Sequence, residues 1–258
     1  MDAIKYIENR NKSLNDTKTS SELPVLEALE FWPYQVILIV IYSTTAFISL
    51  TSNLVTIVVL LKGDRISSEL WKYLINLSVS DIVLSLLSIP FTYTSFMLNH
   101  WIFSTQLCPI VNFAQTCSVF VSVWTLTVIG IDRYNAIIHP LREASTISEW
   151  LRNNKWFLIS LLWLTGMLVG GAQLLYSRAV PFIYGDQLMY DCREVWDDNW
   201  GRSYTVIVFV TTFALPLSIL VFVYSSIAFH IWRHVIPGNS DKQRDDTQRN
   251  RKDKILQT

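Results

Sequence analysis

The sequence predicts an all-α fold, a bundle of helices that cross a membrane. Hydrophobic residues make up 51% of its 258 positions and charged residues only 16%, against roughly 25% charged in a soluble domain. Long uncharged stretches alternate with short charged ones. An uncharged stretch of about 20 residues can cross a bilayer as a helix. This pattern disfavours a soluble enzyme, and the net charge of zero disfavours a nucleic-acid partner.

Five stretches are long enough to span a bilayer, and none shows the alternating pattern of a strand, so we expect five helices. In chain order they are Phe31–Leu61, Tyr73–Leu98, Leu107–Ile131, Trp156–Tyr176 and Tyr204–Ile231. Pro90 and Pro216 are expected to kink the second and the fifth, because proline interrupts helical hydrogen bonding. We read the long segment before Tyr204 as a plain connection.

The Lys and Arg residues predict the orientation. The side that holds the first, third and C-terminal connections carries fourteen of the 21, and cytoplasmic segments carry such an excess. We therefore expect an extracellular tail over 1–33, a membrane domain over 34–232 and a basic cytoplasmic segment over 233–258, in the plasma membrane. Glycosylation acceptor sequences at Asn11 and Asn15 agree with an outer tail.

Asp81 is the only charged residue within the second stretch. A charge at this depth costs about 2.5–3.5 kcal/mol and should face other helices. Asn53 and Ser122 lie at similar depth, so the three side chains are expected to form a polar site that holds water or a small cation such as sodium. The alternative is a purely structural polar contact between helices. We expect no other cofactor or metal.

The three cysteines have different environments. Cys108 begins the third stretch at its outer end, and Cys192 lies in the outer connection before the fifth. Both face an oxidising compartment, which predicts a disulfide between them. Cys117 lies deeper in the third stretch and is expected to be a buried free thiol.

Ordered motifs carry a family resemblance. Cys108 precedes Arg133 by 25 residues and Ser122 precedes it by 11. Taken alone, the Asp132-Arg133-Tyr134 run is better read as a basic flank beside a carboxylate. With the remaining motifs, the sequence resembles the rhodopsin-like family of G-protein-coupled receptors. Those motifs are Asn53 in SNLV, LSVSD ending at Asp81, Trp101 before Cys108, His139-Pro140-Leu141, Trp163, Cys192, and Pro216 followed by Tyr224.

The resemblance implies structural roles for Trp101, Trp163 and Pro216. It also implies a G-protein switch at the inner end. Arg133 would pair with Asp132 in the inactive state and contact a heterotrimeric G protein after activation. Tyr134 belongs to the same motif, Tyr224 would pair with the released Arg133, and Leu141 would be an apolar anchor for the G protein. Ser52 departs from the family's glycine.

Within the family, the segment 89–103 and the run that follows Gln115 look most like neuropeptide Y-type receptors and their neuropeptide F, RYamide and luqin relatives. This resemblance implies an amidated peptide ligand that ends in Arg-aromatic, with Thr92 and Gln115 lining its pocket. An interhelical hydrogen bond is the alternative role for Gln115, and Ser95 departs from the family's pocket tyrosine. The acids of the outer loop, Asp191 and Glu194 among them, would attract a cationic peptide or simply be solvated.

The family has seven spans, and the sequence shows five. We therefore expect a truncated form of a receptor, which would expose Asp81 and Ser122 on its open side and give no peptide-dependent G-protein activation alone. Two alternatives stay open: a natural five-span isoform that pairs with a full-length receptor as a non-signalling partner, and a small membrane transporter. No catalytic motif is present, so an enzyme is not expected.

Overall fold

The computed structural model describes residues 32–62, 70–138, 154–184, 187–196 and 198–235. Within these ranges, five helical segments are long and apolar enough to cross a membrane. The first three spans are α3 (Trp32–Lys62), α4 with α5 (Trp71–Leu87 and Ile89–Leu98), and α6 (Leu107–Ile138). The fourth is α8 (Lys155–Tyr176), and the fifth joins α9 (Asp198–Phe209), a π-helical segment (Val210–Ala214) and α10 (Leu215–Val235). The predicted bundle of five spans is confirmed.

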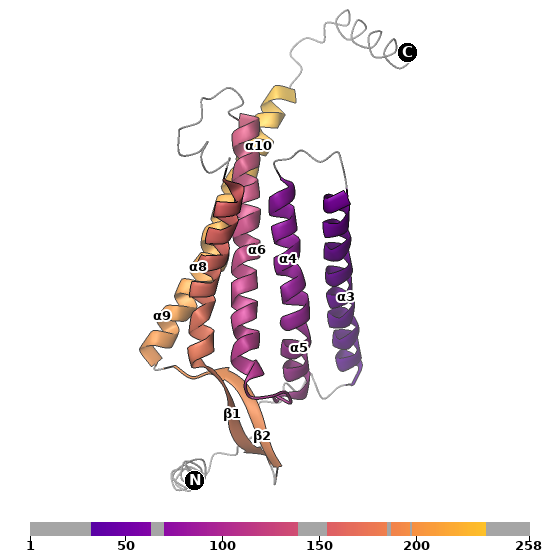
Figure 1. Ribbon diagram of the computed structural model, residues 1–258, viewed down its shortest axis with the longest axis vertical. Coiled ribbons are helices and arrows are strands. Elements are labelled where there is room, and N and C mark those ends of the chain that lie inside the picture. The colour runs from indigo at the N-terminus through magenta and orange to yellow at the C-terminus, as the bar shows by residue number, and fades with distance from the viewer. Residues whose placement is uncertain (1–31, 63–69, 139–153, 185–186, 197, 236–258) are drawn as a thin grey trace, which may run out of the picture.

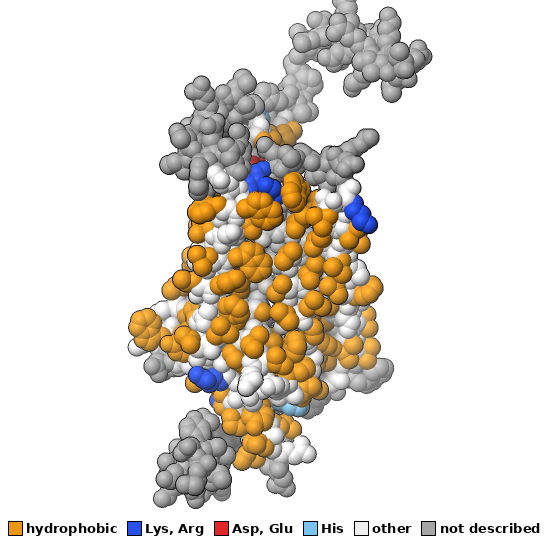
Figure 2. Space-filling model, viewed as in Figure 1, with side chains coloured by type: hydrophobic (Ala, Val, Ile, Leu, Met, Phe, Trp, Pro, Cys, Tyr) orange, Lys and Arg blue, Asp and Glu red, His pale blue; other side chains and the backbone are white. Residues whose placement is uncertain are grey.

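Helix α6 is the central element of the bundle. It packs against α4, α8 and α10, whereas α3 packs on α4 and α5 at the edge, as Figure 1 shows. Its buried positions include Val121 and Thr125, both with no exposed surface. The outer helices instead turn large apolar side chains outward, as Leu168 of α8 does at 79% exposure, and these side chains form a broad apolar belt (Figure 2). Such a surface suits contact with lipid chains.

Both predicted proline sites coincide with irregular helix geometry. The second span is interrupted at Ser88, two residues before Pro90, whose ring nitrogen carries no hydrogen for the helical ladder. In the fifth span, the π-helical segment ends two residues before Pro216. This wider turn leaves the carbonyl of Thr211 within reach of α6, where it accepts a hydrogen bond from the Trp124 Nε1 at 3.0 Å.

A two-stranded antiparallel hairpin was not predicted. Strands β1 (Ser177–Tyr184) and β2 (Gln187–Glu194) lie between α8 and α9, with Ala179 opposite Cys192. The hairpin lies beyond the ends of α8 and α6, across one mouth of the bundle (Figure 1). This segment was expected to be a plain connection, although Gly185-Asp186 between two runs of eight residues is a recognised turn signal.

Small residues let α8 approach α6 closely. A Cβ added at Gly170 would lie 3.1 Å from the Phe113 carbonyl oxygen and 3.3 Å from the Cys117 nitrogen. A Cβ at Gly166, four residues earlier, would lie 3.3 Å from the Cys117 carbonyl oxygen. This spacing of small residues permits close contact between membrane helices. Cys117 is buried and free, as predicted.

The close contact predicts that Gly170→Leu destabilises the bundle. The added side chain would push against the backbone of α6, and overpacking of this kind costs about 1–3 kcal/mol. Gly171→Leu is the matched control, because a Cβ there meets nothing within 4 Å. Thermal unfolding of the purified chain in detergent should show a lower midpoint for the Gly170 variant alone. Equal midpoints for the two variants would contradict the close contact.

Candidate functional site

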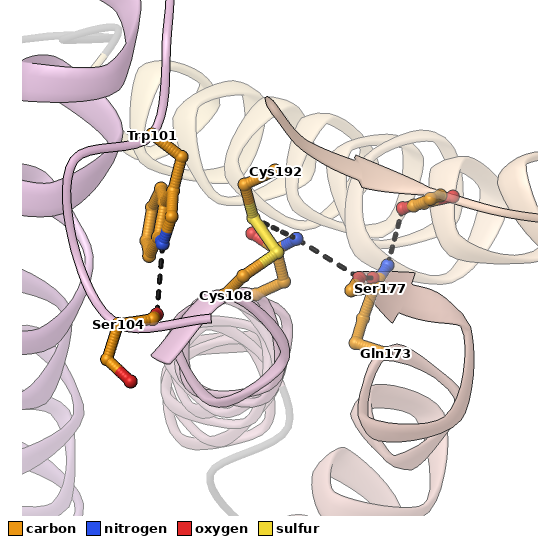
Figure 3. The surroundings of a disulfide bond; sticks show 8 residues. Trp101, Ser104, Cys108, Gln173, Ser177 and Cys192 are labelled. Atoms are coloured by element: carbon orange, nitrogen blue, oxygen red, sulfur yellow. Dashed lines mark hydrogen bonds between the residues drawn. A yellow bond between two sulfur atoms is a disulfide. The ribbon is translucent and has the colours of Figure 1, made fainter. Parts of the chain in front are cut away.

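The mouth of the bundle is organised by a disulfide between Cys108 and Cys192, whose Cα atoms are 5.6 Å apart. The bond joins the first turn of α6 to β2, and Cys108 has no exposed surface. Figure 3 shows the bond between Trp101 on one side and the Gln173 and Ser177 side chains on the other. The predicted disulfide is confirmed, and it holds the hairpin against the central helix.

Trp101 fixes the same hairpin from the connection between α5 and α6. Its backbone N–H donates to the Tyr190 carbonyl at 2.6 Å, and its indole N–H donates to the Ser104 carbonyl at 3.0 Å. The ring is 3% exposed and packs against Phe91 and Phe103. The structural role expected for Trp101 agrees with these contacts.

A polar network joins α8 to the base of the hairpin, where Ser177 pairs with Glu194. The Gln173 amide donates to Glu194 Oε1 at 2.6 Å and to the Tyr204 hydroxyl at 3.3 Å. The Ser177 hydroxyl donates to the Gln173 Oε1. Trp196 donates to the second oxygen of Glu194 at 2.7 Å, so both oxygens of this carboxylate are engaged. Sequence reasoning missed Gln173, because nothing near it in the sequence marks its partners.

Two cavities open beneath the hairpin. The first, of about 320 Å³, is lined by Thr92 and Asp191 among others, and the second, of about 260 Å³, by Gln115 and Glu194 among others. Asn112 and the disulfide cysteine of β2 line both. The structure thus brings the four expected ligand-binding residues to two adjoining cavities; their role in binding stays a prediction.

Asp191 and Gln115 offer polar atoms to these cavities. No partner within the described ranges engages the Asp191 carboxylate, which is half-buried. The Gln115 Oε1 accepts a hydrogen bond from the Ser88 hydroxyl at 2.9 Å. Gln115 therefore makes the interhelical bond that was its alternative role, and it also lines the second cavity. Ser95, which departs from the family pattern, lines the first.

The polar site within the bundle has a different composition from the expected one. Ser122 donates to Asp81 Oδ1 at 2.8 Å, which agrees with the predicted pairing. Asn53 instead donates to the Ser49 carbonyl at 2.8 Å, and Ser49 hydrogen-bonds Ser85. Ser122 is only 9% exposed, so the expectation that it would be open to lipid was wrong: its own neighbours on α4 and α6 cover it.

A second polar contact ties three helices together. The Asn76 amide donates to Thr125 at 2.8 Å, and the Trp163 indole donates to the Asn76 Oδ1 at 2.8 Å. This contact agrees with the structural role expected for Trp163. The part of the chain that the structure describes contains no group of three metal-ligating side chains. A sodium ion near Asp81 stays a prediction, supported by a carboxylate whose Oδ2 has no hydrogen-bond partner there.

At the opposite end of the bundle, Arg133 forms an ion pair with Asp132 at 2.9 Å. The Tyr134 ring packs against Phe222 of α10 at 6.1 Å. Tyr224 also lies on the α6 side of α10, because a Cβ added at Gly130 would lie 3.9 Å from its ring. The structure therefore brings four of the five expected switch residues to one end. Leu141 lies outside the described residues, as do Asn11 and Asn15.

Comparison with known proteins defines the class. Residues 52–258 match the family described as 7 transmembrane receptor (rhodopsin family). The chain belongs to this family, whose members are signalling receptors and not enzymes, and it is a multi-pass membrane protein. The family resemblance seen in the sequence is thereby confirmed.

The similar proteins are peptide receptors. The chain is 29% identical to an RYamide receptor of Tribolium castaneum over 229 residues, which cover 83% of this chain and 60% of that receptor. It is 29% identical to an RYamide receptor of Drosophila melanogaster over 86% of this chain and 48% of that receptor. It is 31% identical to a QRFP-like peptide receptor of Branchiostoma floridae over 75% and 51%. The chain thus spans about half of the length of these relatives.

The network around Gln173 predicts that Gln173→Leu destabilises the mouth. The change would leave the buried Ser177 hydroxyl and the Glu194 carboxylate short of partners, at about 1–3 kcal/mol. Gln187→Leu is the control, because Gln187 is exposed at the tip of the same hairpin. The unfolding midpoint of the purified chain should fall for Gln173→Leu. If both variants unfold at the wild-type temperature, the network does not stabilise the hairpin.

Proposed function

We propose that this chain forms the ligand-binding mouth and the G-protein-facing end of a receptor for a neuropeptide. The ligand class is an amidated peptide that ends in arginine followed by an aromatic residue. Three observations support the proposal: the peptide receptors to which the chain is similar, the cavities beneath the hairpin, and the ion pair at the opposite end. The hairpin end faces the outside, in agreement with the charge distribution.

The free carboxylate of Asp191 is the observation that carries this proposal. A guanidinium group suits a carboxylate that has no partner of its own, because the two form charge-assisted hydrogen bonds. Phe96 and Val111 line the same cavity and offer apolar surface for an aromatic side chain. Gln115 in the adjoining cavity has a free amide donor for the carbonyl oxygen of a terminal carboxamide. Acid, apolar and amide groups thus match the three parts of such a ligand.

The inner end supports signalling through a heterotrimeric G protein. Arg133 is held by its neighbour Asp132, and a held arginine that is released when helices move is a two-state electrostatic switch. The Arg133 Nε is buried without a hydrogen-bond partner. Tyr224 of α10 lies beside Gly130, which precedes Arg133 by three residues on α6. Its side chain is 52% exposed, and it is the proposed partner of the released arginine.

The proposal is tested with the complete transcript that encodes this chain, expressed in cells. An amidated peptide ending in Arg-Tyr-amide should produce a saturable, dose-dependent G-protein response. The same peptide with a free carboxyl terminus should be much weaker, because it brings a negative charge to an acidic mouth. The absence of any response to amidated peptides, in cells where the protein reaches the surface, would contradict the proposed ligand class.

Asp191→Asn is predicted to weaken peptide binding about tenfold or more, since hydrogen bonds to charged groups contribute about 1.5–3 kcal/mol. The measurement is competition binding at the cell surface, normalised to receptor number. Arg178→Gln is the control, because Arg178 is an exposed charge on the same hairpin that lines neither cavity. Unchanged affinity of the Asp191 variant would remove this residue from the site.

A further inference from the structure

The outer edge of β2 carries backbone groups that the hairpin does not use. Pro181 of β1 lies opposite Tyr190 and has no N–H, so a strand tolerates it where the backbone groups face away from the partner strand. The Trp101 N–H agrees with this direction, because it donates to the Tyr190 carbonyl from outside the hairpin at 2.6 Å. The direction of the backbone groups repeats at every second residue of an antiparallel pair. Leu188 therefore also turns its N–H and carbonyl outward from β2.

The outward groups of Leu188 are free to bind another chain. No backbone group of the described residues outside the hairpin bonds its N–H or carbonyl, and its side chain is 57% exposed. Ile183 lies directly opposite, is 59% exposed, and turns its own groups outward from β1. Pro181 interrupts that second edge, since it offers no N–H there. The edge of β2 is therefore the better site for an added strand.

This free edge continues into the first cavity. Asp191 follows Leu188 by three residues on β2 and lines that cavity together with Asn99 and Trp101. Figure 1 shows β2 on the α5 side of the hairpin, where Trp101 contacts it. Three strand residues span about 10 Å. A peptide whose arginine contacts Asp191, as proposed above, therefore has its preceding residues within reach of Leu188.

We propose that the peptide ligand adds a short parallel strand to the edge of β2 at Leu188. The inference rests on the proposed function, and it names the part of the receptor that contacts the residues before the Arg-aromatic end. Because Asp191 follows Leu188, a peptide with its carboxyl-terminal end in the cavity runs in the same direction as β2. The Leu188 N–H then donates to one peptide carbonyl, and the Leu188 carbonyl accepts from the peptide N–H two residues further along.

The test is competition binding at the cell surface with the peptide that ends in Arg-Tyr-amide, on the receptor expressed from the complete transcript. Leu188→Pro removes the outward N–H and leaves the hydrogen bonds between β1 and β2 in place. It should weaken binding about fivefold, the effect of one backbone hydrogen bond. Ile183→Pro is the matched control, because it makes the same change at the opposite position of β1; it should keep the wild-type affinity.

A second measurement uses the wild-type receptor and changes the peptide alone. Replacing one peptide bond at a time by an ester removes one N–H donor. Affinity should fall about fivefold at one bond before the arginine and stay unchanged at the two neighbouring bonds. Neighbouring N–H groups of an extended strand face opposite ways, and the Tyr190 carbonyl is already engaged by Trp101. Equal effects at all of these bonds would overturn the proposal.

The outcomes separate this inference from the proposed function. If the wild-type receptor binds no amidated peptide, the proposed function fails and strand addition fails with it. If the wild-type receptor binds the peptide and both proline variants bind it equally well, strand addition alone is wrong. If Leu188→Pro changes only the oligomeric state, measured by cross-linking at the cell surface, the edge pairs with a second copy of the receptor, which also overturns the proposal.

Discussion

The covalent bond between Cys108 and Cys192 fixes where the outer hairpin lies, and the shape of the mouth depends on that position. The bond ties β2 to the first turn of α6, the helix that packs against most of the bundle. The Trp101 backbone contact with Tyr190 and the Gln173 contact with Glu194 then hold the hairpin on two further sides. With the hairpin held at three places, Asp191 and Glu194 line the two cavities.

Within the membrane, α6 and α8 provide hydrogen-bond partners for polar side chains of α4. Without partners, these groups would be costly in lipid. The Asp81 carboxylate accepts from Ser122, and Asn76 bonds Thr125 on one side and Trp163 on the other. Each bond joins α6 or α8 to α4, so a polar group that would be costly in hydrocarbon contributes to helix association. The two ends of the bundle therefore differ in chemistry, with cavities at one end and an ion pair at the other, while its middle is tied by internal hydrogen bonds.

Features set by composition were predictable from the sequence. Gaps between charged residues located the five spans, and the placement of cysteines gave the disulfide and the buried Cys117, because these depend on local chemistry and depth. The hairpin was missed because a pair of short strands gives a weak signal beside long apolar runs. Gln173 and Gly170 were missed because their roles arise from contacts between elements far apart in the sequence. Asn53 was expected to join Asp81 because the two lie at similar depth. Its side chain instead bonds the Ser49 carbonyl four residues earlier on its own helix.

The most direct test of this account is hydrogen exchange at the Trp101 amide, which donates to the Tyr190 carbonyl only while the hairpin is docked. The purified wild-type chain should protect this amide. Replacing both Cys108 and Cys192 with serine should speed its exchange about tenfold or more, as expected for local opening, while amides in the middle of α6 stay protected. Cys117→Ser, which leaves the disulfide intact, should keep the wild-type rate. An unchanged Trp101 rate without the disulfide would contradict the claim that this bond positions the hairpin.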